Sequence, residues 1–188
     1  LWDSGEASFV MTAVSMGVDP YEATAEQREQ IKQRLIELKP NLLTYWVDYS
    51  EVIQMISAGD VWLASNAWPD AYGALLDEGV PVEYIEPVEG RLGWVCGYGI
   101  SSGARDLELA HEFLDALLAP ASMAYLTDYY YYGAANAASL EIADPDIVAL
   151  LDLSEPQVLA RATVFYEGLT DEQREFMTSM WDEVKAAP

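Results

Sequence analysis

Basic residues are scarce in this sequence. Its 188 residues include 9 Lys and Arg against 32 Asp and Glu, which gives a formal net charge of −23. Nucleic acids and anionic membranes are bound through a basic footprint, so the composition argues against both as partners. The charge favours a cationic partner, and it equally suits a protein that is simply soluble in a salty or extracytoplasmic setting.

Cysteine and histidine each occur once, as Cys96 and His111. One cysteine excludes an internal disulfide bond and a cysteine metal cluster. The sequence has no phosphate-binding loop, no Gly-x-Ser-x-Gly motif and no zinc-type histidine pair. We therefore predict no enzyme, no catalytic residue, no metal and no cofactor. An enzyme with Cys96 as its nucleophile stays open as the alternative.

Long apolar runs are also missing. No stretch approaches the roughly 20 residues of a membrane span, so no membrane insertion is expected. No secretory signal pattern precedes the first helix, and the chain opens at Leu1 instead of Met. A processed protein or a fragment is therefore expected. With 52% hydrophobic residues, the chain is predicted to be globular.

Helix and strand signals alternate along the chain. Two capping boxes, Thr24 with Gln27 and Thr170 with Gln173, mark helix starts. Helices are predicted at 6–16, 24–38, 50–57, 69–79, 104–118, 120–128 and 170–186, and two short helical pieces flank Pro145 and Pro156. Ser50 is expected to cap the helix at 50–57, and Pro69 is expected in the first turn of the helix at 69–79. Strands are predicted at 42–46, 61–65, 82–85 and 91–100. This order predicts an α/β fold with a mainly parallel sheet flanked by helices, and it places Trp62 in the core.

The strand at 91–100 alternates bulky and small residues. One side carries glycines, which weaken a strand unless a neighbour approaches closely or the strand bends. The bulky side presents Trp94, Cys96 and Tyr98. A plain core strand explains the same pattern.

Aromatic residues gather at the predicted strand ends and in the turns that follow them. They are Tyr45, Trp46, Trp62, Trp68, Trp94, Tyr98 and Tyr132. Ligands of open α/β sheets bind beyond the carboxyl ends of the strands. Aromatic rings with a few carboxylates suit a cation that carries methylene groups. Core packing is the alternative for each ring.

Several segments, taken in order, resemble one family. They are Asp3-Ser-Gly-Glu-Ala-Ser-Phe9, Leu38-Lys-Pro-Asn41, residues 59–70 with Trp68-Pro-Asp70, Gly90-Arg-Leu-Gly-Trp94, the helix ending at Pro120, and Tyr132 to Asn136. Together they resemble the C-terminal part of the periplasmic spermidine/putrescine-binding proteins, which are the solute-binding components of ABC importers.

The resemblance implies a periplasmic-binding-protein-like (type II) fold with two α/β lobes that close on a ligand. It implies that the chain is incomplete. Residues 1–93 and 140–188 would form the second lobe, while residues 94–139 would belong to the first lobe, most of which is absent.

The resemblance also implies ligand residues. Trp94 corresponds to an aromatic wall, Tyr132 to a pocket tyrosine and Asp70 to an amine-binding acid. Trp68 lies one position from the usual tryptophan. For Asp70, complementing a helix dipole is the alternative role.

Some departures from the family concern carboxylates. Cys96 stands where family members often carry an acid. Acids are also expected where this chain has Ser4 and Ala7, although Asp3 and Glu6 stand next to them. Fewer carboxylates favour a ligand with a single positive centre over a full polyamine.

The sequence therefore predicts a periplasmic solute-binding receptor of an ABC importer. Its partners would be a small cationic, nitrogen-containing solute and the permease subunits, with self-association through the surface left by the missing lobe. A truncated fragment that binds nothing is the further alternative.

Overall fold

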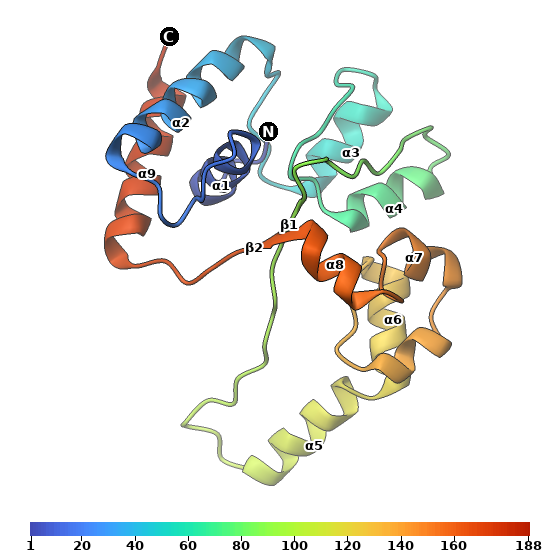
Figure 1. The fold of residues 1–188 in the computed structure, drawn as a ribbon. Coiled ribbons are helices and arrows are strands. Elements are labelled where there is room, and N and C mark those ends of the chain that lie inside the picture. The colour runs from blue at the N-terminus through green and yellow to red at the C-terminus, as the bar shows by residue number, and fades with distance from the viewer. The chain divides into compact units, whose positions relative to one another are not determined.

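The computed structural model describes the backbone of residues 1–188 and all side chains except those at 158 and 162. The chain forms two compact units, drawn in Figure 1. The first unit holds Leu1–Leu92 and Tyr166–Pro188, and the second holds Gly93–Phe165.

Three helices build the core of the first unit. They are α1 (Gly5–Ser15), α2 (Ala25–Leu38) and α9 (Asp171–Ala186), and they lie against one another although α9 is distant in sequence (Figure 1). Their inward faces carry the buried residues Phe9, Ala13, Ile31, Leu35, Met177, Met180, Trp181 and Val184, and Leu1 and Ala23, which lie outside the three helices, belong to the same buried cluster. The helical period of these apolar positions puts them on one stripe per helix, which is why the three helices pack together.

Both predicted capping boxes are confirmed. Thr24 accepts the N–H of Gln27 and the Gln27 side chain accepts the N–H of Thr24, at the start of α2. Thr170 and Gln173 repeat this exchange at the start of α9. Each box satisfies backbone donors that a helix start otherwise leaves without a partner.

Two further helices of the first unit pack on each other: α3 (Tyr49–Ser57) and α4 (Pro69–Asp77). The prediction that Ser50 caps α3 is wrong, because Asp48 is the N-cap and accepts the N–H of Ser50. Pro69 occupies the first turn of α4 as predicted, where its missing N–H costs no hydrogen bond. A short 3₁₀ helix, η1 (Lys39–Asn41), follows α2.

The second unit is mostly helical. It contains α5 (Leu107–Leu117), α6 (Pro120–Tyr130), the 3₁₀ helix η2 (Ala137–Glu141), α7 (Pro145–Leu150) and α8 (Pro156–Ala162). Its core is small and centres on Ala124, Ala143 and Val148, with Leu140 and Leu153 packed against them. None of the described residues of α5 is buried.

Strands are shorter than the sequence predicts. β1 (Arg91–Gly93) pairs with β2 (Thr163–Phe165), and one isolated parallel bridge joins Trp2 and Trp46. Residues 61–65 and 82–85 form no strand, and the predicted strand at 91–100 is reduced to β1. A strand requires a hydrogen-bonded neighbour, and apolar character alone does not supply one.

The prediction for Trp62 is wrong. The sequence predicts a buried residue in the middle of a strand, but in the structure Trp62 is 98% exposed. Residues 61–65 are not paired as a strand. Their side chains therefore do not alternate between the two faces of a sheet, and nothing directs the ring of Trp62 inward.

The compact units differ from the predicted lobes in the placement of residues 140–165. This segment groups with residues 93–139, because η2 and α7 pack on α6. The correspondence between these units and the lobes of a longer protein stays a prediction.

Candidate ligand-binding site

Four aromatic side chains of the first unit form a cluster, here called the tryptophan cluster: Trp2, Trp46, Trp68 and Tyr49. The ring centroids of Trp2 and Trp46 are 6.0 Å apart, with the rings stacked at 24°. Trp68 meets both edge-on, at 5.6 Å from Trp2 and 5.9 Å from Trp46. Tyr49 adds a ring 6.4 Å from Trp68. Trp46 is 1% exposed, whereas the other three rings keep contact with solvent.

Backbone hydrogen bonds bring Trp2 and Trp46 together. The N–H of Trp46 donates to the carbonyl of Leu1 at 2.9 Å, and the N–H of Asp3 donates to the carbonyl of Trp46 at 2.8 Å. These bonds make the parallel bridge between the two tryptophans. Neighbouring residues of paired strands project to the same face, so the two indoles lie side by side.

The predicted ligand residues Trp68 and Asp70 lie at the start of α4. Trp68 is the N-cap and its side chain makes no capping hydrogen bond, so the ring is available to the tryptophan cluster. Asp70 is half-buried, and its Oδ1 accepts the N–H of Ala71 at 2.9 Å. That bond agrees with the alternative role of Asp70 at the helix start.

The carboxylate of Asp70 is partly desolvated. Burial raises its pKa, although backbone N–H groups of Ala71 and of Asp70 itself act in the opposite direction. Among the described side chains, no Lys or Arg forms an ion pair with Asp70. A cation next to such a carboxylate would stabilise its charged form.

Ser4 and Glu6 lie at the start of α1. Ser4 is the N-cap, and its Oγ accepts the N–H of Ala7 at 3.2 Å. Glu6 lies close enough to Tyr166 that its charge adds to burial in raising the pKa of that phenol. The structure thus gives Ser4 a capping role, and a ligand role for either residue stays a prediction.

Trp94 and Tyr132 meet inside the second unit. Their ring centroids are 6.0 Å apart and the rings are inclined at 71°, an edge-to-face contact. Trp94 is 40% exposed and Tyr132 is half-buried. The structure therefore brings these two predicted ligand residues together, and their role in binding stays a prediction.

The backbone around Tyr132 is held by a buried threonine. The hydroxyl of Thr127, at 0% exposure, donates to the carbonyl of Tyr132 at 2.9 Å. Tyr131 ends α6 in the left-handed region at φ 56°, and its N–H donates to the carbonyl of Thr127. This reversal, which a non-glycine residue adopts at a cost, directs the chain away from α6 at Tyr132.

Cys96, the nucleophile of the enzyme alternative, is exposed, and so is His111, the single histidine of the chain. Cys96 belongs to a strongly acidic chain, with a formal net charge of −23. Across the described part of the chain, no group of three or more His, Cys, Asp or Glu side chains is arranged to hold a metal ion.

Sequence reasoning missed Trp2 and Tyr49 as members of the tryptophan cluster. A signal was present: a tryptophan is followed by an aspartate within two positions at Trp2, at Trp46 and at Trp68. It also missed the contact between Asp3 and Trp181, in which Asp3 Oδ1 accepts the indole N–H at 2.6 Å. No local pattern could reveal that contact, because the two residues are 178 positions apart.

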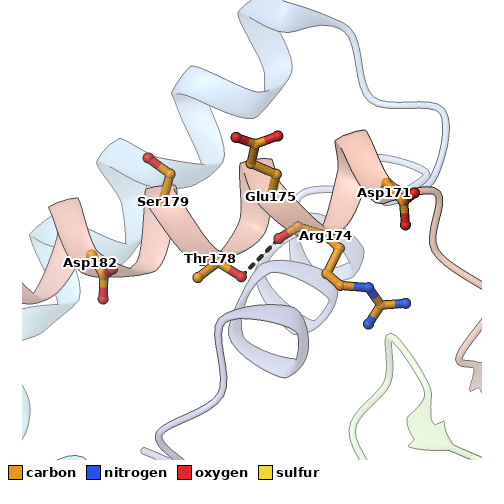
Figure 2. Close-up of a pocket in the computed structure, with 6 residues that line it drawn as sticks. All are labelled: Asp171, Arg174, Glu175, Thr178, Ser179 and Asp182. Atoms are coloured by element: carbon orange, nitrogen blue, oxygen red, sulfur yellow. Dashed lines mark hydrogen bonds between the residues drawn. The ribbon is translucent and has the colours of Figure 1, made fainter.

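A depression on α9 lies outside the predicted site (Figure 2). It has a volume of about 510 Å³ and is lined by Asp171, Arg174, Glu175, Thr178, Ser179 and Asp182. All of these residues belong to one helix, so no second element closes the space. We assign it no binding role.

A second depression, of about 500 Å³, lies in the second unit. Its lining is largely apolar and comes from α5, α6 and the segment after β1: Tyr98, Leu117, Ala121, Ser122, Met123, Tyr125 and Leu126. Among the described lining residues there is no charged side chain, so this groove lacks an anchor for a cation.

The sequence and the fold were compared with those of known proteins, and both point to one class. The sequence profile of the bacterial extracellular solute-binding proteins matches residues 1–150. The fold is similar to that of an ABC transporter substrate-binding protein from Bradyrhizobium japonicum USDA 110, with a TM-score of 0.72 at 21% identity, over 97% of this chain and 56% of that one. This similarity confirms the predicted fold class.

Curated relatives belong to the same class. The putrescine/cadaverine-binding protein of Pseudomonas aeruginosa is 26% identical over 148 residues, which is 75% of this chain and 42% of the relative. The putrescine-binding periplasmic protein PotF of Escherichia coli is 26% identical over 196 residues, covering 98% of this chain and 51% of that protein.

The chain belongs to the bacterial extracellular solute-binding protein family. It spans about half the length of the curated relatives that it matches. None of its described helices is both long and apolar enough to cross a membrane.

Proposed function

We propose that this chain forms part of the solute-binding receptor of an ABC importer and recognises a small cationic, nitrogen-containing solute of the polyamine type. The receptor works without catalysis, in the periplasm, and delivers its solute to the permease subunits. In the whole protein, lobe closure is stabilised by contacts that the ligand makes only in the closed state.

The observation that carries the proposal is the combination of Trp68 and Asp70. An aromatic face attracts a cation through the ring quadrupole and covers its methylene groups. A half-buried carboxylate without an ion-pair partner fixes the position of the charge. The net charge of −23 adds a long-range attraction for cations.

The relatives support the ligand class. Two of them carry names that specify putrescine, and one of these also specifies cadaverine. Both solutes are linear diamines, in which two ammonium groups flank a methylene chain. Trp94 and Tyr132, an aromatic pair within the second unit, are proposed ligand residues as well. Cys96, Ser4 and Glu6 complete the proposed ligand residues.

Calorimetric titration of the 188-residue chain with putrescine tests the proposal. The parent should bind, and Asp70→Asn should abolish binding. Because burial raises the pKa of Asp70, its charge destabilises the fold slightly at neutral pH, and Asp70→Asn should keep the melting temperature or raise it.

The matched control is Asp77→Asn, which removes an exposed acid from the other end of α4. It should bind putrescine like the parent. If Asp70→Asn also binds like the parent, Asp70 is only a helix-start residue. If the parent binds neither putrescine nor cadaverine nor any other cation, the proposed function is wrong.

A further inference from the structure

The tryptophan cluster contains more aromatic rings than the binding of a primary amine requires. Trp46 forms a buried base that the partly exposed rings of Trp2 and Trp68 contact, and the partly exposed Tyr49 packs on Trp68. The four ring contacts within the cluster have centroid separations between 5.6 and 6.4 Å. We propose that this cluster, together with Asp70, binds a methylated ammonium head group. The inference rests on the proposed function and specifies its ligand class.

Hydrogen-bonding capacity is the first argument. A primary ammonium carries three N–H donors and needs acceptors for them. The tryptophans of the cluster supply only donors, since an indole has a single N–H and no acceptor. In the described structure the N–H of the buried Trp46 has no acceptor itself. A head group without N–H donors loses nothing in these surroundings.

Acids close in sequence to members of the cluster provide the second argument. Asp70 is two positions after Trp68, while Asp48 and Glu51 flank Tyr49 in the sequence. Each of them already accepts a backbone N–H, from Ala71, Ser50 and Val47 respectively. Their negative charge remains available to a nearby cation, but part of their acceptor capacity is used. This combination suits a diffuse charge more than a directional N–H donor.

Ring chemistry is the third argument. A methylated ammonium spreads its charge over methyl groups, so several aromatic faces can contact it at once. It is also less strongly hydrated than a primary ammonium, and its transfer from water to an aromatic surface costs less. Tryptophan gives the strongest cation–π attraction of the aromatic residues, and three of the four rings are tryptophans.

Calorimetric competition between choline and putrescine tests the inference on the full 188-residue chain. We expect choline to bind at least about tenfold more tightly than putrescine. The neutral isostere 3,3-dimethyl-1-butanol, in which carbon replaces the charged nitrogen, should bind at least about tenfold more weakly than choline, because only the cation gains from the ring quadrupole.

Two matched variants locate the site. Trp68→Leu should lose at least about tenfold in choline affinity, since it removes the ring that touches every other member of the cluster. Trp62→Leu makes the same exchange in the same segment at a fully exposed ring, and it should bind choline like the parent. Circular dichroism at the titration temperature checks that both variants are folded.

The outcomes separate this inference from the proposed function. Putrescine binding with weaker choline binding overturns the inference and leaves the proposed function standing. Equal choline affinity in Trp68→Leu and Trp62→Leu also overturns it. If neither choline nor putrescine binds, both fail. Choline binding that depends on charge and on Trp68 supports the inference.

Discussion

The rings of Trp94 and Tyr132 are in edge-to-face contact at 6.0 Å, although 38 positions separate the two residues in the sequence. We expect Trp94→Ala to weaken putrescine binding by about 1–3 kcal/mol, because it removes a cation–π contact and the apolar area buried with it. Calorimetry measures the change. Val95→Ala, at the exposed neighbouring position, is the control and should bind like the parent. Equal affinities for the two variants would remove Trp94 from the ligand residues.

Asp3 joins the start of the chain to α9. Its Oδ1 accepts the N–H of Trp181 at 2.6 Å and an N–H of Lys185 at 3.1 Å. Burial disfavours the charged carboxylate, but the hydrogen bonds from Trp181 and Lys185 and the charge of Lys185 outweigh it, so the pKa of Asp3 is lowered. Asp3→Ala should lower the free energy of unfolding by about 1.5–3 kcal/mol, the range for hydrogen bonds to a charged group.

The pH dependence of Asp3 has a defined sign. Because its pKa is lower in the folded than in the unfolded state, the stabilisation is complete above the unfolded value of about 3.9 and is lost as the pH falls through the folded pKa. Urea titrations from neutral pH downward should therefore show the parent and Asp3→Ala converging in acid. A difference in unfolding free energy that is constant over this range would contradict the assignment.

Gly93 has a close neighbour, as the small face of the predicted strand suggested. A Cβ added at Gly93 would overlap with Cγ2 of Thr163, whereas one added at Gly97 would meet nothing within 4 Å. Gly93→Ala should therefore lower the free energy of unfolding by about 1–3 kcal/mol through overpacking, and Gly97→Ala should not. Adding Thr163→Ser to Gly93→Ala removes the obstructing methyl group and should restore stability. Failure of this rescue in urea unfolding would show that the cost does not arise from this contact.

Local signals in the sequence predicted the helices well. The capping boxes at Thr24 and Thr170 act through residues three positions apart, so their outcome depends little on the rest of the fold. The strands depended on partners elsewhere in the chain, and apolar runs such as 61–65 do not identify a partner. For this reason Trp62 was placed in the core and is exposed.

The candidate site was predictable only in part. The family resemblance supplied Trp68 and Asp70, and it also supplied Trp94 and Tyr132. Trp2 escaped notice because its place beside Trp68 results from backbone pairing with Trp46, 44 positions further along the chain. Clusters assembled by long-range pairing leave only weak traces in a single sequence.

The last prediction concerns association of the chain with itself. The apolar residues of α5 are unusually open to solvent: Leu107 is 59%, Leu109 60% and Phe113 62% exposed. Exposed apolar patches of this kind promote association, because pairing removes them from water. We therefore expect the apparent mass measured by light scattering to rise with protein concentration. Phe113→Lys should shift the equilibrium toward the monomer, while Leu43→Lys, at an exposed leucine of the first unit, should not. A monodisperse monomer at every concentration would show that this surface does not drive association.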